Sequence, residues 1–249
     1  MTIQESLKNW AKDAVDVFNP LSQTTSTQFY LQSPLDQITA PVDTLVLGIN
    51  PHGEISKGAE KSPEEFLKGN PKWDRRFEGN HVSREWSNYF GKAHKMICGN
   101  QERDHLMLDN DKKTVWENLT PFVTPDSGQL KPEHWDAGLR STADLITILK
   151  PKRIILLSES GFNRLAPYIA IEHLPIVKDT ITQRTIEIGT IGGYPAIQLS
   201  HPSREWITHS LFLPMIVQLH KLHAVDEKIE PLEEAATKIK NQLRRIEVI

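Results

Sequence analysis

The chain has 249 residues, of which 38% are hydrophobic and 24% are charged, and its formal net charge is −3. This is an ordinary globular composition, and because no run approaches the ~18 apolar residues of a membrane-spanning helix, we expect no membrane span. The weak negative charge excludes a general attraction to nucleic acid, and the one cysteine, Cys98, excludes an intrachain disulfide and a four-thiolate cluster.

The predicted elements of the first half alternate between helix and strand. An amphipathic helix is expected over about 4–18; it lacks the basic-then-apolar layout of a signal peptide, and with the single cysteine this favours a cytoplasmic protein. A strand over 44–49 is hydrophobic on both faces, as an interior parallel strand is. Residues 53–82 form a long polar inserted loop with a short helix near "SPEEFLKG", and a helix over 83–97 follows.

The second half continues the alternation up to the C-terminus. We expect strands over 114–119, 152–158 and 194–200, a hairpin around 176–190, a hairpin turn at Gly192-Gly193, and helices over 132–149, from near Gly161, over 205–223 and over 226–246. Such alternation predicts an α/β fold, a three-layer α/β/α sandwich with a mostly parallel central sheet, as a single domain over 1–249.

Three polar loops follow predicted strands: "GINPHG", "NLTPF" and "SHPSREW". In a parallel sheet the carboxyl ends of the strands share one edge, which is where α/β proteins bind ligands. We therefore expect the three loops to open onto one cleft.

The motifs in these loops resemble those of the uracil-DNA glycosylase superfamily. "GINPH" (48–52) is similar to the first motif of its mismatch-specific and single-strand-selective monofunctional branches, which carry Asn where the classical enzymes carry Asp. "HPSRE" (201–205) resembles the second motif of the single-strand-selective and classical branches, and "VWENLTPF" (115–122) resembles the segment around a base-reading Asn. "RFEGNHVSREWSNYFGKAHKMI" (76–97) is similar to the segment that follows the first motif in the mismatch-specific branch.

The resemblance implies an enzyme that flips a nucleotide out of the stack and breaks its glycosidic bond. Asn50 would then orient the attacking water, because an amide can hold a water but cannot take its proton. His201 would stabilise the negative charge that moves onto the base, and Asn118 would read the edge of a pyrimidine. Each also has a purely structural interpretation: Asn50 as a cap of its own turn, Asn118 as a partner of backbone groups, His201 as an ordinary polar residue.

The remaining predicted contacts are with the base and the DNA backbone. Phe77 is the expected stacking wall, with a core position as its structural alternative, and Trp73 or Phe66 could substitute for it. The resemblance places His52 beside the base, at a position where the superfamily carries Tyr or Gly. This difference allows a base bulkier than uracil. The phosphate contacts are assigned to Ser203 and to backbone amides around Pro51 and Pro202, and the wedge that fills the emptied stack is assigned to Arg204, with a surface salt bridge as the alternative.

The sequence thus predicts a monofunctional DNA glycosylase that acts as a monomer on a damaged or modified pyrimidine, with DNA as its partner and without metal or cofactor. If the base were one of the hypermodified bases of phage genomes, the role would be defence against phage. The alternative from another class is an inactive superfamily member that binds nucleic acid or a nucleotide. A hydrolase of free nucleosides is a third candidate.

Overall fold

The computed structural model describes residues 1–54, 58–70, 114–178 and 185–199. Its elements, in chain order, are α1 (Ile3–Thr25), β1 (Thr44–Gly48), α2 (Pro63–Leu67), β2 (Thr114–Asn118), the 3₁₀ helix η2 (Ser127–Gln129), α6 (Pro132–Leu149), β3 (Arg153–Leu157), α7 (Gly161–Leu165), β4 (Ile171–Lys178), β5 (Thr185–Ile191) and β6 (Tyr194–Leu199). The predicted helices over 83–97, 205–223 and 226–246 lie outside the described residues.

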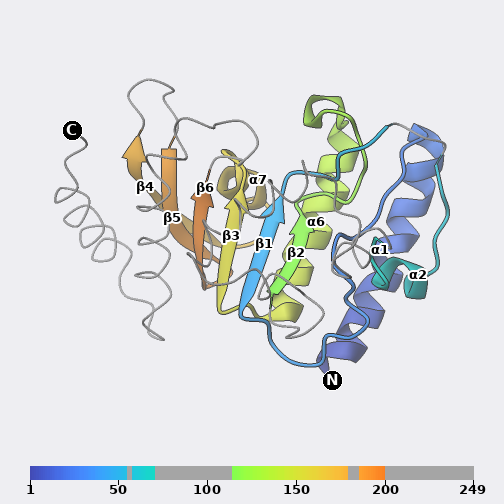
Figure 1. The fold of residues 1–249 in the computed structure, drawn as a ribbon, viewed down its shortest axis with the longest axis horizontal. Coiled ribbons are helices and arrows are strands. Elements are labelled where there is room, and N and C mark those ends of the chain that lie inside the picture. The colour runs from blue at the N-terminus through green and yellow to red at the C-terminus, as the bar shows by residue number, and fades with distance from the viewer. Residues whose placement is uncertain (55–57, 71–113, 179–184, 200–249) are drawn as a thin grey trace, which may run out of the picture.

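The six strands form one mixed sheet with the order β2-β1-β3-β6-β5-β4. Strands β2, β1, β3 and β6 are parallel to one another, whereas β5 is antiparallel to both of its neighbours. The arrowheads of the four parallel strands therefore point to the same edge in Figure 1. The predicted α/β fold with a mostly parallel sheet is confirmed.

The central strands are buried on both faces, which explains their uninterrupted apolar sequences. Leu45 and Leu47 of β1 face the helices, and Val46, on the opposite face, is also fully buried. In β3, Ile154 and Ile155 show the same pattern on their two faces. The described helices all pack on one face of the sheet, so the third layer of the expected sandwich stays a prediction.

Helix α1 begins at a capping box, in which the Thr2 hydroxyl accepts from the N–H of Glu5 and the Glu5 carboxylate accepts from that of Thr2. The predicted end near residue 18 is wrong, because the helix continues through Pro20 to Thr25. Its last turn is held by tertiary contacts: the Ser22 hydroxyl donates to the carbonyl of Ala59 and accepts from the N–H of the same residue, both at 3.1 Å. These bonds help to offset the one helical hydrogen bond that proline cannot make.

An aromatic cluster joins α1 to the helix-facing side of the sheet. The ring of Phe18 lies 5.5, 5.8 and 5.3 Å, centroid to centroid, from Phe29, Phe66 and Phe122. Phe66, in the predicted inserted loop, is 1% exposed and also packs against Trp10. Phe66 is therefore a core residue, and its proposed use as a substitute stacking wall is wrong.

Two hairpins complete the sheet, as the sequence predicts. Strands β4 and β5 pair antiparallel, beginning at Ile171 rather than near 176. Strands β5 and β6 are joined by Gly192 and Gly193, whose φ angles are +60° and +83°. A two-residue turn of this kind needs positive φ at both positions, which glycine adopts without steric cost.

The sequence expectation of no membrane span agrees with the helices in the described ranges. None of them combines the length and the apolar character that a membrane crossing requires.

Candidate functional site

The loops that follow β1 and β2 continue the parallel pairing of their strands past the edge of the sheet. The N–H groups of Leu119 and Thr120 donate to the carbonyls of Gly48 and Ile49 at 2.8 and 3.1 Å. Further along, the N–H of Thr124 donates to Pro51 and that of Gly53 to Thr124, both at 3.3 Å. We call residues 49–54 and 119–124 the paired loops. They fix the positions of the residues that stand at the carboxyl ends of β1 and β2.

Asn50 is held in the paired loops by its side-chain amide. Its Nδ2 atom donates to the Pro51 carbonyl at 2.9 Å, to the Thr124 hydroxyl at 2.8 Å and, more weakly, to the Phe122 carbonyl at 3.4 Å. The Thr124 hydroxyl donates in turn to the carbonyl of Asp126 at 2.8 Å. Because these acceptors require the NH₂ group on this side, they fix the orientation of the carboxamide and direct Oδ1 away from them.

Asn118, the last residue of β2, lies beside Gly48 of β1 in the parallel register. A β-carbon on Gly48 would be only 2.6 Å from Asn118 Oδ1, so the carboxamide occupies space that glycine leaves open. The Nδ2 atom of Asn118 is inaccessible to solvent and has no hydrogen-bond acceptor among the described residues. Such an unsatisfied donor costs about 1–3 kcal/mol, and a bound group that accepts from it would remove this cost.

The two amides therefore offer complementary chemistry at adjacent strand ends. The Oδ1 atom of Asn50 is an oriented acceptor to which no described residue donates. It can accept a hydrogen bond from a water. Asn118 presents an unpaired donor suited to a carbonyl oxygen. An acceptor for a water beside a donor for a carbonyl oxygen can position that water against a bound ligand that carries such an oxygen.

His52 and Pro51 also belong to the paired loops. His52 is exposed and its backbone forms a parallel bridge with Thr124. Pro51 is buried, and its carbonyl is occupied by Thr124 and Asn50. The N–H of Gly53 is also used within the loops, so it is not a free donor for a phosphate. The DNA contact assigned to the region of Pro51 stays a prediction. It would have to use a backbone donor other than the Gly53 N–H.

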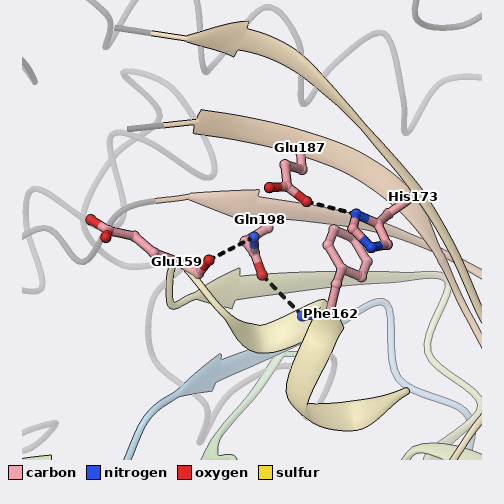
Figure 2. Close-up of polar contacts among 5 residues, drawn as sticks. All are labelled: Glu159, Phe162, His173, Glu187 and Gln198. Carbon is pink, nitrogen blue, oxygen red and sulfur yellow. Dashed lines mark hydrogen bonds and ion pairs between the residues drawn. The ribbon is translucent and has the colours of Figure 1, made fainter. Parts of the chain in front are cut away.

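The carboxyl end of β6 is fixed by Gln198, which is fully buried. Figure 2 shows its side chain between Glu159 and Phe162: Oε1 accepts from the Phe162 N–H at 2.9 Å, and Nε2 donates to the Glu159 carbonyl at 3.3 Å. These bonds tie β6 to the turn between β3 and α7, which the sequence predicts as a strand-to-helix turn. The described part of β6 thus ends at the same sheet edge as β1 and β2.

A second polar contact in Figure 2 joins the antiparallel strands. His173 Nδ1 lies 2.7 Å from Glu187 Oε2, and the imidazole stacks on the Phe162 ring with centroids 4.9 Å apart and planes 8° apart. This pair fastens β4 and β5 to the start of α7. No sequence pattern predicts this pair, because it depends on strand register and on a ring from another element.

The structure thus brings together part of the predicted site. Asn50, Pro51, His52 and Asn118 lie in or beside the paired loops. The other predicted site residues, Phe77, His201, Pro202, Ser203 and Arg204, lie outside the described residues, so their convergence with the two amides stays a prediction. Within the described part of the chain, no three His, Cys, Asp or Glu side chains come together as metal ligands.

The residues that support the two amides carry no signal in the sequence. Thr124 holds Asn50, and Gly48 makes room for Asn118, but neither residue type identifies itself from spacing alone. Comparison with models of known protein families finds no match, and a search of curated proteins finds none. The functional argument therefore rests on the geometry of the site and on the sequence motifs.

Proposed function

We propose that the protein is a monofunctional DNA N-glycosylase that hydrolyses the glycosidic bond of a flipped-out damaged or modified pyrimidine and leaves an abasic site. The observation that carries the proposal is the pair of amides at adjacent strand ends: Asn50 oriented with Oδ1 unoccupied among the described residues, and Asn118 with an unpaired donor. The motif resemblance supports the choice of a pyrimidine in DNA as the substrate.

In this proposal, water adds to C1′ as the bond from C1′ to the base nitrogen breaks, and the bonding electrons leave with the base. Asn50 Oδ1 accepts a hydrogen bond from the water but does not take its proton, which passes to the departing base or to solvent. Asn118 Nδ2 donates to a carbonyl of the base, and His201 stabilises the negative charge there. Because Asn118 Nδ2 has no solvent access in the free protein, a base reaches it only after neighbouring side chains move.

The experiment incubates the protein with DNA containing uracil or bulkier modified pyrimidines and then cleaves abasic sites with alkali. We expect strand breaks on at least one substrate, and a loss of about 100-fold or more in single-turnover rate for Asn50→Ala and for His201→Ala. Thr124→Val serves as the matched control for Asn50: it removes the two loop bonds of the Thr124 hydroxyl, while the carbonyls of Pro51 and Phe122 still hold the Asn50 amide. It should reduce the rate less than tenfold.

A nucleic-acid-binding module without glycosylase activity is the second candidate. One observation favours it: the three bonds of Asn50 Nδ2 explain an asparagine at this position by loop structure alone. Tight DNA binding without strand breaks on any substrate would support the module. If excision does occur, equal rate losses in Asn50→Ala and Thr124→Val would instead show that Asn50 acts through the loops rather than through the water.

A further inference from the structure

Arg164 of α7 is an arginine held in place on two sides. Its guanidinium carbon lies 3.8 Å from the centroid of the Trp135 ring, and its Nε atom donates to the Ser160 hydroxyl at 2.9 Å. The ring fixes the plane of the guanidinium, and the hydroxyl fixes its rotation. No described residue accepts a hydrogen bond from its two terminal NH₂ groups, which can therefore bind another partner.

No carboxylate neutralises this cation among the described residues. The ion pairs between described residues include those of Arg140 with Asp136, Lys152 with Asp43 and His173 with Glu187. Burial lowers the pKa of the Arg164 guanidinium from its usual value, although an arginine remains charged at neutral pH. A half-buried charge without a counterion has an energetic cost, which binding of an anion would offset.

The position of Arg164 relates it to the candidate site. Ser160 lies three residues beyond the carboxyl end of β3, and Trp135 lies in the first turn of α6, which follows the loop after β2. The bond from Nε back to Ser160 directs the side chain towards this edge of the sheet. In Figure 1, α7 lies behind β3, beside the edge to which the parallel strands point. Arg164 is thus on the helix side of the edge that carries Asn50 and Asn118.

We propose that Arg164 binds a phosphodiester group of the DNA strand, next to the extruded nucleotide rather than at it. The inference rests on the proposed function for the identity of the ligand. A guanidinium with a fixed plane and two free terminal NH₂ groups matches the bidentate geometry of a phosphate. Phosphates follow one another every ~3.4 Å along the axis of one strand, so a flanking phosphate is available on the helix side of the site.

Arg140 provides a matched control within the same helix layer. Its guanidinium also lies over an aromatic ring, 5.5 Å from the centroid of Tyr168, but it is exposed and its Nη2 is 3.8 Å from Asp136 Oδ1. Arg140→Gln and Arg164→Gln therefore remove the same formal charge. They differ in that only Arg164 lacks a carboxylate partner among the described residues.

The test measures binding of unmodified duplex and single-stranded oligonucleotides by fluorescence anisotropy over a series of salt concentrations. Arg164→Gln should weaken binding about tenfold at low salt and reduce the slope of log K against log [salt] by ~0.9 for duplex or ~0.7 for single strands. Arg164→Met removes the charge but keeps an unbranched apolar side chain and should behave in the same way, whereas Arg140→Gln should leave the slope unchanged. Thermal unfolding checks that each variant is folded.

An unchanged slope in both Arg164 variants would overturn the proposal, and so would equal effects of the Arg164 and Arg140 substitutions. Binding of unmodified DNA does not require excision, so the two proposals fail separately. If the Arg164 variants bind DNA more weakly but no substrate is cleaved, the glycosylase proposal is wrong and the phosphate site is supported. Excision with no Arg164 effect removes the phosphate site alone.

Discussion

Gly48 is the residue at which the candidate site depends on the absence of a side chain. Its backbone conformation is ordinary for a strand, so glycine is not required there by φ. The requirement comes from Asn118, whose Oδ1 occupies the position that a β-carbon would need. The site is therefore sensitive to the smallest possible substitution at this position.

Gly48→Ala should reduce the free energy of unfolding by about 1–3 kcal/mol, because the methyl group forces the Asn118 carboxamide aside. Adding Asn118→Ala in the same chain should recover about 1 kcal/mol or more of that loss, since the clash is then removed. Urea denaturation of the two single variants and the double variant measures this coupling. Gly128→Ala is the control, because Gly128 is exposed and the nearest neighbour of an added β-carbon would be Asp126 Oδ1, at 3.3 Å.

If the two substitutions are simply additive, Asn118 does not lie against Gly48 in solution. The expectation for Gly128→Ala is a change below about 0.5 kcal/mol.

Strand β2 ends the sheet on one side, and the segment around Ser33 covers that edge. The Ser33 N–H donates to the Trp116 carbonyl at 3.1 Å, and its hydroxyl both donates to that carbonyl and accepts from the Trp116 N–H at 2.8 Å. An uncovered edge strand can pair with another chain, so this segment protects β2 as well as stabilising it.

Ser33→Ala should reduce the free energy of unfolding by about 1–3 kcal/mol, because the buried backbone of Trp116 loses the hydroxyl that it bonds. Thermal or urea unfolding measures the loss. Ser6→Ala removes an exposed hydroxyl that bonds the Thr2 carbonyl at 3.1 Å, and it should change stability by less than about 0.5 kcal/mol. Similar effects of the two substitutions would contradict the assigned role of Ser33.

The stability of the whole molecule should depend on pH through Glu117. This residue is 4% exposed, and its two carboxylate oxygens accept from the N–H groups of Gln32 and Ser33 at 3.0 and 3.2 Å. Burial raises its pKa well above the ordinary value of 4.5, and the two N–H donors oppose only part of that shift. The folded state therefore binds this proton more tightly than the unfolded state does.

The sign follows from this difference. Well below pH 4.5 the Glu117 carboxyl is protonated in both the folded and the unfolded state. As the pH rises above 4.5, the unfolded state loses the proton first. The contribution of Glu117 to the free energy of unfolding therefore falls until the pH passes the folded-state pKa. Urea unfolding of the wild type and of Glu117→Gln from pH 4.5 to 8 measures it: the wild-type stability minus the variant's should decrease with pH. An increase would mean that the N–H donors dominate over burial.

Much of the fold could be predicted because its signals are local. The apolar runs of β1 and β3, the glycine pair at 192–193 and the proline at the start of α6 each determine structure within a few residues. Elsewhere the prediction was wrong because tertiary contacts determine the structure. The bonds of Ser22 hold the last turn of α1 beyond Pro20. Phe66, in a segment expected to be a polar loop, packs in the core.

The candidate site was predicted less completely for the same reason. Asn50 and Asn118 follow strands and carry recognisable motifs, so their place at the sheet edge could be inferred. The partners that orient them come from neighbouring strands: Thr124 is 74 positions from Asn50. The contact between Arg164 and Trp135 depends on how two helices pack, which no local pattern encodes.

The paired loops have a mechanical consequence. Asn50, which would hold the water, is bonded to the segment that follows Asn118, which would read the base. A displacement of Asn50 should therefore also displace the chain beside Asn118. If the proposed function is right, substitutions in either of the paired loops should therefore change substrate choice and reaction rate together.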